Sequence, residues 1–222
     1  MSAATLIIGS KNYSSWSLRP WLFLRKVAFG FQEQVLHFDA ADFRRQLAAL
    51  SPSKRVPLLI DGDLTVWDSL AICEWAAERT GRGVPADPRI RAVMRSVSAE
   101  MHSGFQTLRE TCPMNVRATF RQVRSTPGLV ADIARIDAIW SDCRQRFGAG
   151  GDWLFGEFSI ADAAFAPVAF RFRTYGAELD LQLGPAASQY LQHLLSDPLM
   201  REWQSAAEQE GHSLPATDAV GL

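Results

Sequence analysis

Apolar positions in the first eighty residues fall into short runs and one longer stretch with helical spacing. Residues 5–8 and 34–38 have the length and apolar content of buried strands. Residues 18–29, between them, repeat apolar side chains at helical spacing up to Gly30, and glycine favours the end of a helix. A strand, a helix and a second strand in this order predict a parallel pair with a right-handed crossover.

A second pattern begins after a connecting segment. The Asp61-Gly62 dipeptide separates two runs rich in β-forming residues, which is a strong signal for a β-hairpin. Residues 69–79 then repeat at helical spacing and end before Gly81. The first part of the chain is therefore predicted to run β-α-β, a connection, and β-β-α.

Residues 81–87 hold two glycines and a proline and are predicted to link two domains, 1–81 and 88–222. The second domain is predicted to be all helical, because its apolar side chains recur at helical spacing. The main periodic stretches are 90–108, 129–147, 163–172, 190–195 and 199–203. The tail, 211–222, has no periodicity and is expected to lie loosely on the surface.

The stretch 163–172 is apolar nearly all round, which predicts a central, buried helix. Ser159 and Asp162 precede it in the spacing of a capping box, with Asp in place of the usual Glu. We therefore assign these two residues to structure rather than to catalysis.

The composition narrows the function classes. Hydrophobic residues make up 47% of the 222 residues, charged residues 21%, and the net charge is -1, as in ordinary globular proteins. The sequence contains no block of like charges, the pattern that would predict a nucleic-acid or membrane partner. It also contains no apolar run that approaches the ~20 residues of a membrane span. The N-terminus lacks the pattern of a signal peptide, so a cytoplasmic location is expected.

The three cysteines, Cys73, Cys112 and Cys143, are far apart. They form neither a C-x-x-C redox pair nor a metal-ligand spacing, so no metal site is predicted. Reduced, buried thiols are the expected state.

Candidate chemistry lies in the turn between the first strand and the first helix, where Ser14, Ser15 and Ser17 stand close together. The N-terminus of a helix has free backbone N–H groups and favours an anion. A hydroxyl at this place can hold a thiolate, or it can simply cap the helix.

Four short segments in this order resemble the cytosolic glutathione transferase family, in its serine-type, zeta-like bacterial branch. They are the S-S-W-S-L-R turn at 14–19, S-P-S-K-R-V-P-L-L at 51–59, W-D-S-L-A-I at 67–72 and G-E-F-S-I-A-D at 156–162. The resemblance implies a thioredoxin-like N-terminal domain, that is, α/β, followed by an all-α domain that contributes the electrophile site. It also implies glutathione as co-substrate and a homodimer.

The resemblance assigns the catalytic role to Ser14 or Ser15, with Ser14 as the donor that stabilises the glutathione thiolate. It further implies that Arg55, Val56, Pro57, Asp68 and Ser69 bind glutathione together with Ser14. The bond before Pro57 would be cis and would expose the Val56 backbone to pair with the peptide, or Pro57 would simply begin a strand. Ser69 would hold the γ-glutamyl carboxylate, and Asp68, where the family more often has Glu or Gln, the γ-glutamyl amine.

A second-substrate pocket is expected between the domains. Its candidate residues are Trp16, Met101, Phe105, Arg109, Met114 and Asn115. Apolar side chains with one arginine suit an acidic or partly polar electrophile, although Met101 and Phe105 can equally belong to the core and Arg109 can equally pair with a carboxylate. Trp16 stands where the zeta-type motif has cysteine, which weakens any mechanism based on a protein thiol.

The sequence thus predicts an enzyme that binds glutathione, stabilises its thiolate, and conjugates it to a small electrophile or uses it to isomerise one. The alternative is a non-catalytic glutathione-binding or regulatory module of the same fold.

Overall fold

The computed structural model describes residues 4–179 and 181–222. In chain order its elements are β1 (Ala4–Gly9), α1 (Ser15–Lys26), β2 (Phe31–Leu36), α2 (Phe43–Leu50), β3 (Leu58–Asp61), β4 (Leu64–Val66), α3 (Ser69–Thr80), α4 (Pro88–Ser103), α5 (Gln106–Thr111), α6 (Pro127–Phe147), α7 (Ile160–Leu179), α8 (Pro185–Ser196), α9 (Pro198–Gln209) and α10 (Pro215–Asp218). Within the described residues, no helix is long and apolar enough to cross a membrane.

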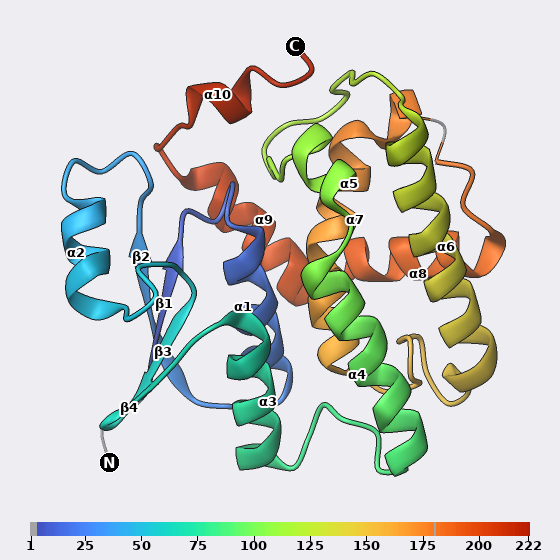
Figure 1. The fold of residues 1–222 in the computed structure, drawn as a ribbon, viewed down its shortest axis with the longest axis horizontal. Helices are drawn as coiled ribbons and strands as arrows, with labels where there is room; N and C mark the ends of the chain where they lie inside the picture. Colours follow the sequence, from blue (N-terminus) through green and yellow to red (C-terminus); the bar gives the residue numbers. More distant parts are fainter. Residues whose placement is uncertain (1–3, 180) are drawn as a thin grey trace.

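The strands form one mixed sheet in the order β2-β1-β3-β4. Strands β1 and β2 are parallel, whereas β3 runs antiparallel to both β1 and β4. Helix α2 lies on one face of this sheet and α1 and α3 on the other (Figure 1). Side chains of β1 alternate between the two faces, so Leu6 and Ile8 join the core under α1 and α3, whereas Ile7 packs with Leu47 of α2.

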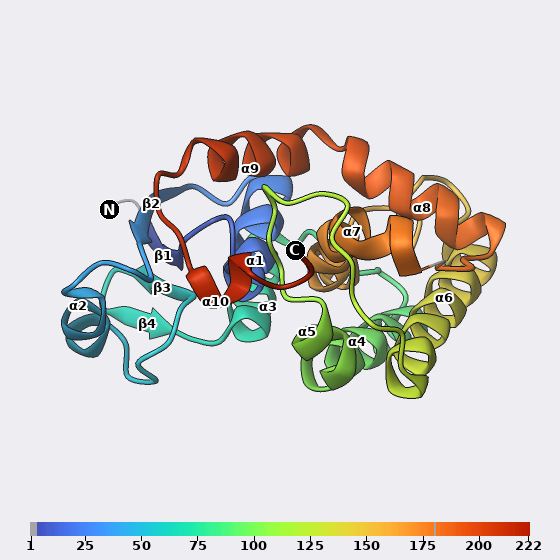
Figure 2. The same cartoon turned by 90° about the horizontal axis from the view of Figure 1, so that it is seen from above.

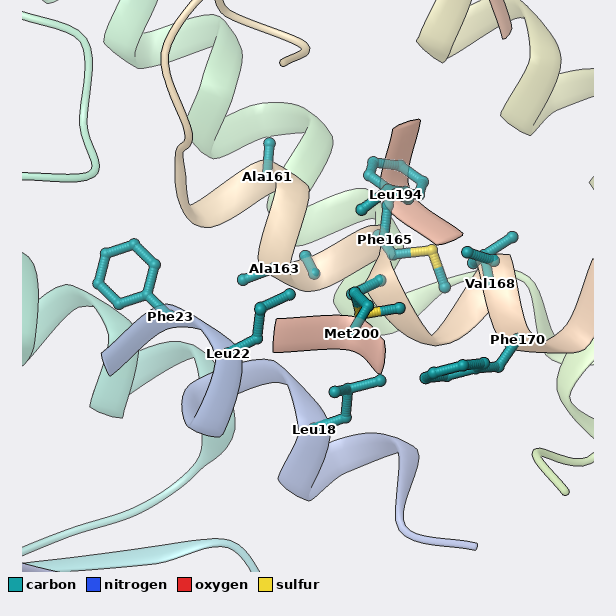
Figure 3. Close-up of a cluster of buried hydrophobic side chains, with 14 of the residues drawn as sticks. Leu18, Leu22, Phe23, Ala161, Ala163, Phe165, Val168, Phe170, Leu194 and Met200 are labelled. Carbon is teal, nitrogen blue, oxygen red and sulfur yellow. The ribbon is translucent and has the colours of Figure 1, made fainter. Parts of the chain in front are cut away.

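The helical half is built around α7. Side chains from α1, α7, α8 and α9 converge there, among them Leu22, Phe165, Leu194 and Met200 (Figure 3). The Asp162 carboxylate accepts hydrogen bonds from the backbone N–H and the hydroxyl of Ser159, which is the reciprocal half of a capping box. The predicted fold class, an α/β part followed by an all-helical part, is confirmed. The domain limits at 81 and 88 stay a prediction.

One long helix expected over residues 90–108 is in fact two. Helix α4 ends at Ser103, Phe105 has a φ of 60°, and α5 begins at Gln106. The Arg109 guanidinium donates to the carbonyls of Gly104 and Met101, so it satisfies oxygens that the end of α4 leaves free. These bonds satisfy carbonyls at the break, and the apolar periodicity of the sequence continues across it.

The expectation of a loose tail is wrong. After α9, which packs on α1, the chain crosses back toward the sheet and forms α10 above the turn that follows β1 (Figure 2). The Glu210 carboxylate accepts from the backbone N–H groups of Lys11 and Asn12, and the Tyr13 hydroxyl donates to Asp218. Polar contacts with residues about 200 positions earlier hold the tail, which explains its lack of apolar periodicity.

Candidate functional site

A cavity of about 400 Å³ opens between the sheet half and the helical half, within the size range of small-molecule sites. Its lining residues are Trp16, Ser53, Arg55, Val56, Pro57, Trp67, Asp68, Ser69 and His102. They come from the N-terminus of α1, the loop before β3, the β4–α3 turn and α4. Five of the residues that the sequence predicts for glutathione, 55–57, 68 and 69, therefore face one cavity.

The bond between Val56 and Pro57 is cis, as expected from the resemblance. Neither the N–H nor the C=O of Val56 takes part in a backbone hydrogen bond within residues 4–179 and 181–222. Val56 lines the cavity, one residue before the buried Pro57 and two residues before the start of β3. An extended peptide can therefore pair with Val56 as an added strand does.

Asp68 and Ser69 stand at the N-terminus of α3. One Asp68 carboxylate oxygen accepts from the Leu70 N–H at 3.0 Å and caps the helix, and the other lies 3.1 Å from His102 Nε2. The Ser69 hydroxyl is buried and has no partner among the described residues. A carboxylate bound here meets a hydroxyl and a helix N-terminus, and an amine meets the Asp68 carboxylate.

The two serines predicted for catalysis lie beside the cavity rather than among its lining residues. Ser14 makes no side-chain cap bond to α1; its hydroxyl donates to Ser17 Oγ at 2.7 Å, and Ser17 Oγ also accepts the Gly9 N–H. Ser15 Oγ accepts from Arg171 Nη2 at 3.3 Å. The plain helix-cap interpretation therefore does not describe Ser14, and Ser15 is left with a free O–H.

Three guanidiniums gather around the start of α1. Arg19 lies 4.3 Å and Arg109 4.8 Å from the centre of the Trp16 ring, and Arg171 reaches Ser15 from α7. Burial, followed by the charges of Arg109 and Arg171, lowers the pKa of Arg19 to about 9, and burial with Arg109 lowers the pKa of Arg171 to about 10. None of the three forms an ion pair within the described residues, so the site carries an excess of positive charge.

Of the residues predicted for the second substrate, Trp16 alone lines the large cavity. Met101, Phe105 and Met114 belong to the hydrophobic core. Asn115 is buried and its amide donates to Asp218 of the tail, while Arg109 caps α4. The tail thus contacts one of these residues, Asn115, and the electrophile pocket stays a prediction.

Sequence reasoning did not assign Ser53, Trp67 or Arg19 to the site, and it left His102 without a role. Ser53 and Trp67 flank predicted binding segments, so they could have been included as neighbours. His102 reaches the cavity from α4, about 35 residues along the chain from Asp68, and only the packing of α4 beside α3 brings these two side chains together.

Within the described residues, no group of three or more His, Cys, Asp or Glu side chains is arranged to hold a metal ion. The three cysteines are free and buried, as expected.

Comparison with known proteins agrees with this geometry. Residues 13–79 match the N-terminal domain of glutathione S-transferases, and residues 116–193 match their C-terminal domain. Maleylacetoacetate isomerase of Rattus norvegicus is 28% identical over 165 residues, 71% of this chain and 72% of that protein. The same-named protein of Mus musculus is 27% identical over 191 residues, 84% and 85% of the two chains.

A crystal structure of a glutathione transferase homolog from Burkholderia GL BGR1, with bound glutathione, has the same fold. Its TM-score is 0.69 at 20% identity, and the match covers 94% of this chain and 100% of that one. Both domain matches, the order of the elements and the position of the cavity lead to one conclusion: the chain belongs to the glutathione S-transferase family.

Proposed function

We propose that this protein is a glutathione transferase that binds glutathione in the 400 Å³ cavity and presents its thiolate to a small electrophile. The observation that carries the proposal is the meeting of Val56, Asp68 and Ser69 at one cavity. Val56 offers a backbone N–H and C=O that make no backbone hydrogen bond among the described residues. Ser69 offers a hydroxyl without a partner at a helix N-terminus, and Asp68 offers a carboxylate. These groups match the peptide, carboxylate and amine of a γ-glutamyl tripeptide.

In this mode the γ-glutamyl carboxylate accepts from Ser69 and the α3 N-terminus, and the ammonium lies at Asp68. The cysteinyl backbone pairs with Val56, and the exposed Arg55 guanidinium holds the glycine carboxylate. These contacts direct the thiol toward the N-terminus of α1, where the serines and the arginines lie.

The thiol of glutathione resembles that of Cys, with a pKa of ~8.5, so it is mostly protonated at neutral pH. A hydroxyl donor and a helix N-terminus favour the thiolate, and the nearby Arg171 adds positive charge. The proton leaves to solvent, and the sulfur attacks an electron-poor carbon to form a C–S bond. As the C–S bond forms, the π electrons of the attacked carbon move onto its electron-withdrawing neighbour. In conjugation the C–S bond remains, and the displaced electrons take a proton from solvent or expel a leaving group. In isomerisation the adjacent bond, now single, rotates, and the returning electrons break the C–S bond, which releases the glutathione thiolate.

An acidic electrophile fits the excess charge of Arg19, Arg109 and Arg171. The maleylacetoacetate isomerase names of the rat and mouse relatives support thiol-assisted isomerisation beside conjugation. The family membership supports a homodimer and a cytoplasmic location.

Calorimetric titration of the full chain with glutathione, followed by turnover of an aromatic electrophile, tests the proposal. Arg55→Gln should weaken glutathione binding about 10-fold, because a charge-assisted bond to a carboxylate is lost. Lys54→Gln is the matched control: Lys54 is the exposed neighbour of Arg55 and does not line the cavity. Equal affinities for the two variants would contradict the proposed pose.

The alternative is a glutathione-binding module without turnover, and the burial of Met114 in the core and of Asn115 at its bond to Asp218 favours it. Binding of glutathione without turnover of any electrophile, acidic ones included, would support this alternative. Turnover of one electrophile would exclude it.

A further inference from the structure

A second, much smaller cavity of about 10 Å³ lies directly behind the glutathione site, between α1, α3, α4 and α7. It shares Ser69 and His102 with the larger cavity, and Arg19 forms another part of its wall. Its size is that of a single water molecule.

Four polar atoms of this wall have no protein partner, whereas the Ser98 hydroxyl donates to the Met94 carbonyl. Arg19 Nε and Nη2, Ser69 Oγ and His102 Nδ1 are all buried without a hydrogen bond to any of the described residues. Arg19 is only 3% exposed and Ser69 1%. Buried donors and acceptors are almost always satisfied in folded proteins, by protein groups or by ordered water.

Arg19 is the most unusual of these residues because it is buried and charged. Its guanidinium stacks on Trp16, but the neighbouring charges of Arg109 and Arg171 repel it. A buried cation without a carboxylate partner lowers the stability of the fold. Groups retained at such a cost are commonly functional.

We propose that one ordered water fills the small cavity and connects Arg19 to Ser69 and His102, which makes Arg19 and His102 positioning residues for the amino-acid head of the γ-glutamyl group. The water accepts from the two Arg19 N–H groups and donates to Ser69 Oγ and His102 Nδ1. These four bonds satisfy all four orphaned atoms. This inference rests on the proposed function, since it assumes that glutathione is the ligand.

The same network determines which atom donates and which accepts in each hydrogen bond between the water and the ligand. With its oxygen accepting from the water, Ser69 directs its own O–H toward the bound carboxylate. With Nδ1 accepting from the water, His102 carries its proton on Nε2 and donates it to Asp68. Asp68 is then fixed between the α3 N-terminus and His102, ready for the ammonium.

Arg19 therefore acts on the γ-glutamyl head without touching it, and it has no role toward the cysteinylglycine part. Calorimetry with two ligands, glutathione and cysteinylglycine, separates these parts. We expect Arg19→Met to weaken glutathione binding about 10-fold and to change cysteinylglycine binding less than about 2-fold. The melting temperature of this variant should stay equal or rise, because a buried unpaired charge is removed.

Two further variants keep the test decisive. Arg19→Lys retains the charge next to the water and should recover part of the affinity for glutathione. Arg19→Met combined with Ser69→Ala should weaken binding no more than the stronger single change, because both break one network. A crystal structure should show a water within hydrogen-bond distance of both Arg19 and Ser69.

Equal weakening of both ligands by Arg19→Met, or additive effects of Arg19→Met and Ser69→Ala, would overturn the inference and leave the proposed function standing. Glutathione binding by Arg19→Met that equals that of the wild-type chain would do the same. A wild-type chain that binds neither ligand would contradict the proposed function itself.

Discussion

The Ser14 hydroxyl donates its proton to Ser17 Oγ across 2.7 Å, inside the turn that opens α1. Ser17 Oγ also accepts the Gly9 N–H, so the bond belongs to a buried network that ties the end of β1 to α1. Ser15, by contrast, accepts from Arg171 and keeps its own proton. The family resemblance names Ser14 as the residue whose hydroxyl donates a hydrogen bond to the thiolate. The hydrogen bonds in the structure instead favour Ser15 for this role.

Replacing the two serines separately tests this assignment. We predict that Ser15→Ala lowers kcat/KM for an aromatic electrophile about 10- to 100-fold, since a hydrogen bond to a charged group contributes ~1.5–3 kcal/mol. Ser14→Ala should lower kcat/KM less but reduce the melting temperature more, because Ser17 loses its buried partner. The reverse order of the two kcat/KM losses would return the role to Ser14.

Asp68 is predicted to serve both the helix and the ligand. Asp68→Ala should lose its cap on α3, a cost of ~1 kcal/mol in the free energy of unfolding, and should also weaken glutathione binding. Asp87→Ala is a matched control, because Asp87 caps α4 through two backbone N–H groups and does not line the cavity. Denaturant unfolding should show similar losses in the free energy of unfolding for the two variants. Calorimetry should show weaker glutathione binding for Asp68→Ala alone. Unchanged glutathione affinity in Asp68→Ala would rule out its contact with the amine.

The C-terminal tail is predicted to depend on Tyr13. The Tyr13 hydroxyl donates to Asp218 and accepts from Arg117 and from the Leu214 N–H. Tyr13→Phe should therefore reduce the free energy of unfolding by about 1–3 kcal/mol and make residues 211–222 more sensitive to protease. Tyr175→Phe, which removes a single bond to the Pro113 carbonyl, serves as the comparison. Equal rates of tail cleavage in the two variants would show that Tyr13 does not hold the tail.

The three thiols are predicted to be inert in the folded protein. Burial raises the pKa of Cys112 and of Cys143 to about 12 and that of Cys73 well above its usual range. A raised pKa leaves almost no thiolate at pH 8, and the thiolate is the reactive form. Mass spectrometry after iodoacetamide treatment should find no label on the native chain and three labels after unfolding. A rapidly labelled native cysteine would contradict this account.

Much of the fold follows from local patterns. The Asp61-Gly62 pair predicts the β3–β4 hairpin because the turn requires a positive φ, and Gly62 has a φ of 67°. Helix α2 was predicted only as a connecting segment, although Phe43, Leu47 and Leu50 have the spacing of an apolar stripe and pack against the sheet. The break after Ser103 was missed because apolar periodicity continues across it, although Gly104, which ends α4, is a helix-ending residue.

The site was predictable where its residues share a short segment, and less so where distant elements meet. Arg55 to Pro57, Asp68 and Ser69 were recognised because each segment carries its own motif. The roles proposed for Arg19 and His102 follow only from the packing of α1, α3 and α4 around one small cavity. Asn115 lies beneath the tail through its bond to Asp218, a contact between residues about 100 positions apart.

The cavity and the turn that opens α1 are proposed to act together, the first by binding glutathione and the second by stabilising its thiolate. The most direct test is a pH titration of the ultraviolet absorbance of the thiolate, with glutathione bound to the wild-type protein. We expect a thiol pKa at least about one unit below that of free glutathione, equivalent to ~1.4 kcal/mol of preferential thiolate stabilisation. A bound thiol that titrates at the same pH as free glutathione would contradict it.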